Sequence, residues 1–164
     1  MTSCNDCHPL ANRPVATTLD LEKLDGPRLD LAARKYVGTS FLHQGRDPSV
    51  GVDCVGLASV LLRECGQHEL ASHDLTNYAR NPNGGELERR MQAAFGQPVK
   101  ELAPGCLVTV QFYGPTRHVG IVGEHNGRLT LIHAVGVPPR VVEHGIDDKW
   151  RRRITGIYRV GGAA

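Results

Sequence analysis

The chain has 164 residues, of which 40% are hydrophobic and 22% are charged, and its formal net charge is +2. The length is that of one globular domain, and so small a net charge gives no reason to expect a nucleic-acid partner. No apolar stretch approaches the roughly 18 residues that a membrane span needs, so we expect no membrane insertion.

Residues 1–25 form the first segment and mix proline, asparagine, threonine and charged residues without a sustained hydrophobic period. This pattern predicts an extended arm, followed by a domain over residues 26–160 and a short tail over residues 161–164. The first residues have neither a basic start nor an apolar core, so no signal peptide is expected. The arm is a candidate for ordering against a partner.

The five cysteines are odd in number and follow no regular framework, which favours reduced thiols over structural disulfides. Cys65 and Cys106 are predicted to be core residues. Cys4, Cys7 and His8 have the spacing to chelate one metal ion or iron–sulfur cluster, but two thiols and one imidazole need a partner to complete such a site. We expect no metal or cofactor in the domain itself.

The first half of the domain is predicted to be helical. Residues 27–38 have a helical apolar pattern that ends at a glycine, and the turn-rich residues 39–51 indicate a loop. Asp53 is a typical helix-capping residue, so Cys54 falls in the first turn of a helix that Gly66 ends.

The second half of the domain is predicted to be a β-sheet. One more helix is expected over residues 86–95. The expected strands that follow cover residues 107–112, 118–123, 129–135, 140–143 and 154–158. Helices first and strands last predict an α+β class, with N-terminal helices packed on a C-terminal antiparallel sheet of about five or six strands.

The position of Cys54 suggests a chemical role for its thiol. A helix N-terminus carries a partial positive charge and unpaired backbone N–H groups, both of which favour a thiolate. The same N–H groups are able to stabilise an oxyanion when a thiolate attacks a carbonyl. The sequence therefore makes Cys54 a candidate nucleophile.

Two histidines are brought together by the predicted hairpin around Asn126-Gly127, a dipeptide typical of two-residue turns. If these residues form the turn, the numbers of paired residues add up to 253. His118 and His133 then lie on one face as diagonal neighbours, roughly 7 Å apart or less at Cβ, with Gly120 leaving room between them. One cysteine and two histidines can supply a nucleophile, a base and a base-orienting group. His43, His144 and the other histidines are expected to be polar surface residues, and of these only His43, close upstream of Cys54, is a residue to watch for a role in the site.

Several segments together carry a family resemblance. They are Val52-Asp53-Cys54-Val55-Gly56-Leu57, His118-Val119-Gly120-Ile121 and Leu131-Ile132-His133-Ala134. The chain resembles the NlpC-type (p-sixty) papain-like cysteine peptidases over about residues 27–160. The run from Trp150 to Ile154 is similar to that of the bacteriophage tail and gene-transfer-agent members of the family.

The resemblance implies Cys54 as nucleophile, His118 as general base and acid, and His133 as the residue that orients His118. It also implies substrate-binding positions at Asp53, Phe41 and Val55. The implied reaction is hydrolysis of the γ-D-glutamyl–diamino acid amide bond of peptidoglycan stem peptides. The implied setting is a virion tail tip, made in the host cytoplasm, that opens the cell wall for genome delivery and binds other tail proteins through the arm.

Two other functions stay open at this point. The domain can be a catalytically weak or inactive tail-assembly protein on the same fold, since Phe41 stands where many members have tyrosine and Cys106 where aspartate is usual. It can also be a related amidase or acyltransferase, because a thiol and an imidazole define acyl transfer but not the acyl group.

Overall fold

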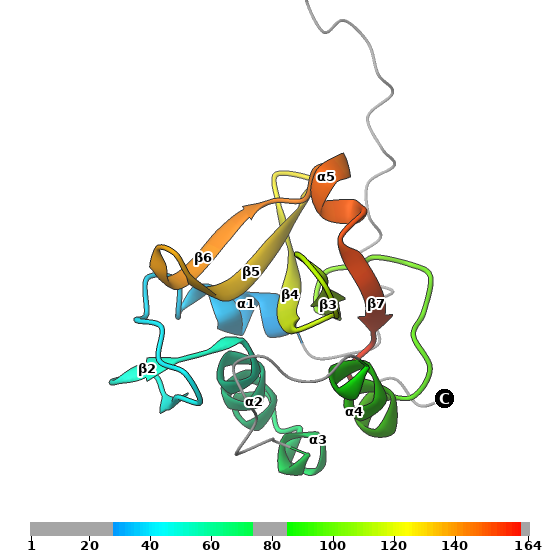
Figure 1. Ribbon diagram of the computed structural model, residues 1–164. Coiled ribbons are helices and arrows are strands. Elements are labelled where there is room, and N and C mark those ends of the chain that lie inside the picture. The colour runs from blue at the N-terminus through cyan, green and yellow to red at the C-terminus, as the bar shows by residue number, and fades with distance from the viewer. Residues whose placement is uncertain (1–27, 74–84, 162–164) are drawn as a thin grey trace, which may run out of the picture.

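The computed structural model describes residues 28–73 and 85–161. Its helices lie mostly on one side of a five-stranded sheet (Figure 1). The helices are α1 (Leu29–Arg34), α2 (Cys54–Glu64), α3 (His68–Ser72), α4 (Glu86–Phe95) and α5 (Asp148–Arg151). No helix of the described ranges is long and apolar enough to cross a membrane.

The large sheet has the strand order β6-β5-β4-β3-β7, and all its neighbouring strands are antiparallel. Its strands are β3 (Leu107–Val110), β4 (His118–His125), β5 (Arg128–Gly136), β6 (Pro139–Gly145) and β7 (Ile154–Tyr158). A separate hairpin is formed by β1 (Arg46–Asp47) and β2 (Gly51–Val52). The predicted α+β class is confirmed.

The β4–β5 hairpin has the predicted register. Its pairs run from Ile121 with Ile132 to His125 with Arg128, so the numbers of paired residues add up to 253. Asn126 and Gly127 both have positive φ, 51° and 74°, as a two-residue hairpin turn of this kind requires. The turn chemistry thus fixes which side chains of the hairpin share a face.

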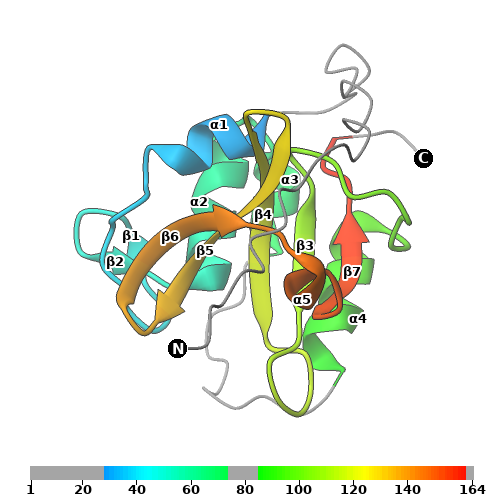
Figure 2. The same ribbon diagram turned by 90° about the horizontal axis from the view of Figure 1, so that it is seen from above.

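The two faces of the large sheet bury different side chains. Val119, Ile121 and Ile132 pack against α1 and α2 in the main core. On the opposite face, Val110 and Leu131 belong to a second cluster that includes Trp150 of α5. Figure 2 shows α5 lying over this second face, away from α2. His118 pairs with Val110, so its side chain lies on the face that α5 covers.

An ion-pair network ties α1 to the sheet. Arg34 donates to Glu143 of β6 at 2.9 Å and to the carbonyl oxygen of Glu124 at 2.6 Å. Its guanidinium also lies 3.7 Å from Asp30, a carboxylate that is fully buried. These contacts hold α1 across β4 and β6, the strands that carry or flank the histidines.

The sequence missed several short elements. The predicted loop over residues 39–51 contains the β1–β2 hairpin, and neither α3 nor α5 was expected. The predicted helix over residues 27–38 is regular only for the six residues of α1 and ends in turns. Strand β6 extends beyond the predicted residue 143 to Gly145, which brings one more histidine into the sheet.

The remaining expectations about the termini stay untested. The arm, with Cys4, Cys7 and His8, lies outside the described residues, as does most of the predicted tail.

The two cysteines predicted to be core residues are at least partly buried. Cys106 is buried as predicted, and Cys65 is partly buried against the main core. The two thiols are free, as is that of Cys54.

We predict that Arg34→Met lowers the free energy of unfolding by about 2 kcal/mol, because it leaves the partly buried Glu143 without its cation and removes the hydrogen bond to the carbonyl oxygen of Glu124, whereas Asp30 keeps its ion pair with Arg28. Chemical denaturation monitored by circular dichroism measures the change. The matched control is Lys35→Met, which removes an exposed ion pair with Glu64 and should leave stability nearly unchanged. Equal losses in the two variants would contradict the anchoring role of Arg34.

Candidate active site

The start of α2 is held by the carboxylate of Asp53, which is 3% exposed. One oxygen accepts the backbone N–H of Gly56 at 2.8 Å and faces Arg46 at 3.2 Å. The other accepts the backbone N–H of Gln44 at 2.7 Å. Asp53 therefore caps the helix, as the sequence predicted, and also binds the preceding loop to it.

Gly56 lets this loop lie directly on the first turn of α2. A Cβ at position 56 would stand 1.9 Å from the carbonyl oxygen of Gly45. Because that oxygen belongs to the backbone, it cannot move away as a flexible side chain would. Glycine at position 56 and the bonds of Asp53 thus fix the place of Cys54 relative to the loop.

The thiol of Cys54 lies at the junction of α2 and β4. Backbone N–H groups of Val119, Val55 and Cys54 itself bond to the sulfur and favour its charged form. Burial outweighs them, with a smaller contribution from the negative charge of Asp53, and raises the pKa of Cys54 to about 11. The N–H groups at the start of α2 therefore favour the thiolate, as expected, but desolvation outweighs them.

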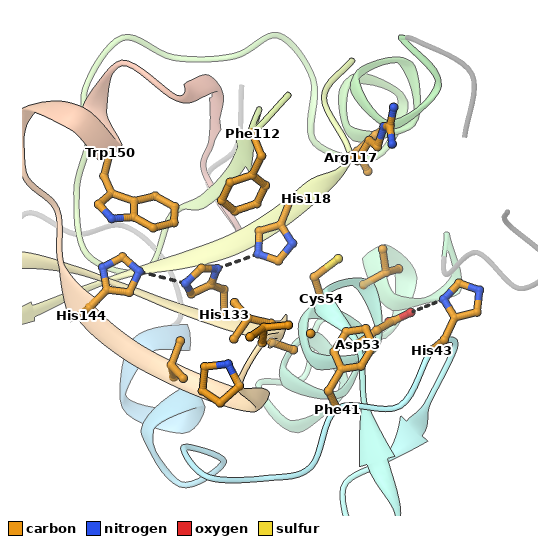
Figure 3. A pocket seen from close by; sticks show the side chains of 18 of the residues that line it. Phe41, His43, Asp53, Cys54, Phe112, Arg117, His118, His133, His144 and Trp150 are labelled. Atoms are coloured by element: carbon orange, nitrogen blue, oxygen red, sulfur yellow. Dashed lines mark hydrogen bonds and ion pairs between the residues drawn. The ribbon is translucent and has the colours of Figure 1, made fainter. Parts of the chain in front are cut away.

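His118 and His133 are brought together as the hairpin register predicted. Nε2 of His118 lies 2.7 Å from Nδ1 of His133. Burial lowers the pKa of His118 to about 4 and that of His133 to about 2, so both rings are neutral near pH 7. In Figure 3 the side chain of Cys54 points toward His118 from the side away from His133. Nδ1 of His118 is thus the nitrogen available to the thiol.

Gly120 contributes to this arrangement in a different way from the one expected. A Cβ at position 120 would stand 2.6 Å from a methyl group of Leu131 and 3.6 Å from Cβ of His133. The space that the glycine leaves is therefore filled mainly by Leu131, not by the imidazole of His133.

His144 was expected at the surface, and this was wrong. Its Nε2 lies 2.9 Å from Nε2 of His133, and its ring is stacked near Trp150 with 4.4 Å between centroids. Register could have revealed it: Leu131 pairs with His144 and His133 with Val142, which makes the two histidines diagonal neighbours on one face. No turn signal in the sequence indicated that β6 continues to this residue.

Aromatic rings cover the histidines. Trp150 lies 5.4 Å from His133, and Phe112 lies 5.3 Å from His118 and 5.6 Å from Trp150, all between ring centroids. These rings limit the access of water to the imidazoles, which is the physical source of the lowered histidine pKa values. Phe112 was not singled out from the sequence, and Trp150 was noted only for the family resemblance of its run, not as part of the site.

These groups open into a cavity of about 750 Å³. All six predicted site positions line it: Phe41, Asp53, Cys54, Val55, His118 and His133. Its wall also includes charged side chains that sequence reasoning missed, Glu86, Arg90 and Arg117, together with His43 and His144. Within residues 28–73 and 85–161, no group of three or more histidine, cysteine or acidic residues is arranged to hold a metal ion.

The site therefore has the parts of a nucleophilic acyl-transfer centre. A cysteine at a helix N-terminus points toward an imidazole, and that imidazole is bonded to a second one in a cavity large enough for a peptide segment. The substrate-binding roles of Asp53, Phe41 and Val55 stay predictions. The carboxylate of Asp53 is already engaged in structural hydrogen bonds.

No family model and no curated protein matches the chain by sequence. Solved structures do resemble it. A Staphylococcus aureus protein, described as similar to a lipoprotein of the NLP/P60 family, has a TM-score of 0.56 and 20% identity, with 93% of this chain and 46% of that chain covered. The chain thus spans about half the length of that protein.

Two further structures match at the scale of a single domain. The NlpC/p60 domain of the peptidoglycan hydrolase SagA has a TM-score of 0.50 and 21% identity, with 80% of this chain and 95% of that chain covered. An N-acetylmuramoyl-L-alanine amidase from Bacteroides uniformis has a TM-score of 0.52 and 15% identity, with the same coverage. At these identities the likeness shows the fold, and the chain has the papain-like α+β fold of the NlpC/P60 domains.

Proposed function

We propose that the protein is a cysteine peptidase that hydrolyses peptide bonds of peptidoglycan. The observation that carries this proposal is the convergence of three side chains from separate elements on one cavity: Cys54 at the start of α2 points toward His118 on β4, which is bonded to His133 on β5 (Figure 3). An inactive relative has no need to keep a buried, hydrogen-bonded imidazole pair beside a thiol. This favours catalysis over a purely structural role.

The resting site holds a neutral thiol and a neutral imidazole. As the sulfur of Cys54 attacks the substrate carbonyl, Nδ1 of His118 takes the thiol proton, and backbone N–H groups at the start of α2 stabilise the oxyanion. The protonated His118 then gives its proton to the leaving amine, and a thioester remains on Cys54. Water, deprotonated by His118, attacks the thioester and releases a carboxylic acid and the free thiol.

The substrate class we propose is the stem peptide of peptidoglycan, cut at the amide between γ-D-glutamate and a diamino acid. SagA, a structural neighbour, is described as a peptidoglycan hydrolase. The cavity also carries charges of both signs, since Glu86, Arg90 and Arg117 line it, and a stem peptide carries both carboxylates and an amine. These observations support peptidoglycan as the class of substrate. The particular amide bond that is cut is our proposal.

A second candidate is cleavage of the amide between the sugar and the first amino acid. It is favoured by the likeness to a structure described as an N-acetylmuramoyl-L-alanine amidase. The same thiol and imidazoles serve both reactions, and only the bond presented to Cys54 differs.

The biological setting that we propose is a phage tail tip that opens the cell wall locally for genome delivery. It rests on the resemblance of the run from Trp150 to Ile154 to tail-associated members of the family. The arm would bind other tail proteins, with Cys4 and Cys7 able to share a metal or iron–sulfur site with such a partner. An inactive tail-assembly role is the alternative, and the activity assay below distinguishes it.

We predict that Cys54→Ala lowers the release of peptides from purified peptidoglycan by at least about 1000-fold, because it removes the nucleophile. Mass spectrometry of the soluble muropeptides measures the release and names the bond: free diamino-acid termini indicate the peptidase and free muramoyl lactyl groups the amidase. Cys65→Ala, at the other end of the same helix, is the matched control and should keep wild-type activity. Equal release by wild type and Cys54→Ala would refute catalysis by this site.

A second prediction concerns acid pH. Protonated His118 cannot accept the thiol proton, so kcat/KM should stay high well below the ordinary histidine pKa of about 6.5 and fall only as the pH approaches about 4. The profile is measured on soluble muropeptides, with circular dichroism at each pH to verify that the fold persists. An acid limb near pH 6.5 would show that burial does not depress the pKa of the base.

A further inference from the structure

Three imidazoles form a continuous hydrogen-bonded chain beside Cys54 (Figure 3), and a backbone carbonyl extends it. His118 bonds to His133 at 2.7 Å, and His133 bonds to His144 at 2.9 Å. His144 ends the chain, with its Nδ1 at 2.9 Å from the carbonyl oxygen of Gly145. The chain therefore starts at the base and ends at a group that can only accept a hydrogen bond.

The carbonyl oxygen of Gly145 sets the direction of every bond in the chain. Because it cannot donate, Nδ1 of His144 carries a proton, and an imidazole with a single proton on Nδ1 accepts at Nε2. Nε2 of His133 is then the donor to His144, which leaves Nδ1 of His133 as an acceptor. His118 must donate to it from Nε2, so Nδ1 of His118 carries no proton and faces Cys54.

We infer that His144 is a positioning residue of the reaction: with the carbonyl of Gly145, it holds His118 through His133 in the tautomer that accepts the thiol proton. This inference rests on the proposed function, since it assigns a role within the same site. His144 needs no contact with the reacting atoms to act in this way.

The opposite direction of the chain would disable the base. If the residue at position 144 donated to His133, Nδ1 of His133 would carry the proton and Nε2 of His118 would accept. Nδ1 of His118 would then present a proton to Cys54 and accept none. The low pKa values that burial gives His118 and His133 keep both rings neutral, so neither can carry two protons and escape this constraint.

The residues around His133 leave it few hydrogen-bond partners other than His118 and His144. Trp150 lies 4.4 Å from His144 and 5.4 Å from His133 between ring centroids, and His133 is 1% exposed. At a ring as buried as that of His133, an N–H that loses its acceptor is not readily compensated by water. The partner at position 144 therefore decides the tautomer.

Two substitutions of His144 test whether position 144 must accept a hydrogen bond from His133 or can donate one to it. His144→Gln supplies a carbonyl oxygen that can accept from His133, and it should keep the alkylation rate of Cys54 by iodoacetamide within about fivefold of wild type. His144→Lys supplies only donors, and it should lower that rate by about 100-fold. Peptide mapping by mass spectrometry follows Cys54 separately from Cys65 and Cys106.

The tautomers themselves are read by nitrogen-15 NMR of histidine-labelled protein. In the wild type and in His144→Gln, His118 should carry its proton on Nε2, and in His144→Lys on Nδ1. The exposed His125, on β4, provides matched controls: His125→Gln and His125→Lys should leave both the alkylation rate and the tautomer of His118 unchanged.

The inference is overturned if wild-type His118 carries its proton on Nδ1, or if His144→Lys alkylates at the wild-type rate. Should His144→Lys fail to fold, as judged by near-ultraviolet circular dichroism, the wild-type tautomer and the rate of His144→Gln still decide. Iodoacetamide needs no peptidoglycan, so the outcome is independent of the substrate. Absence of muropeptide release with the expected tautomer would refute the proposed function and leave the role of His144 standing.

Discussion

The bonds of one buried carboxylate support the rest of the site. Asp53 accepts from Gly56 at the start of α2 and from Gln44 in the preceding loop, and it is nearly inaccessible to solvent. Without these bonds the N-terminal turn of α2 would lose its cap and the loop its attachment. Cys54, the next residue, would then no longer be held against β4 and the imidazole of His118.

Desolvation explains both the uncharged resting state of the nucleophile and base and the need of every ring nitrogen for a hydrogen-bond partner. Burial raises the pKa of Cys54 and lowers that of His118, so the nucleophile and the base rest uncharged and separate charges only when a carbonyl is attacked. The same burial requires every ring nitrogen to have a suitable partner. A dry site of this kind depends on hydrogen-bond direction more than on net charge.

The sequence predicted much of this, and the reasons for its failures are physical. The cap at Asp53 and the Asn126-Gly127 turn are local signals, and they correctly placed the thiol and the β4–β5 register. The raised pKa of Cys54 could not be predicted from the sequence, because burial is a property of the assembled fold. His144 was missed because β6 has no comparable turn signal to show how far it extends, and the cover provided by α5 comes from only four residues.

Trp150 gives the molecule an optical property. It is the single tryptophan of the sequence, and its ring lies against His144 and His133. The tryptophan fluorescence of the protein therefore comes from a ring in the wall of the cavity, so a peptide that binds there changes the surroundings of the indole and alters a signal that no other tryptophan obscures.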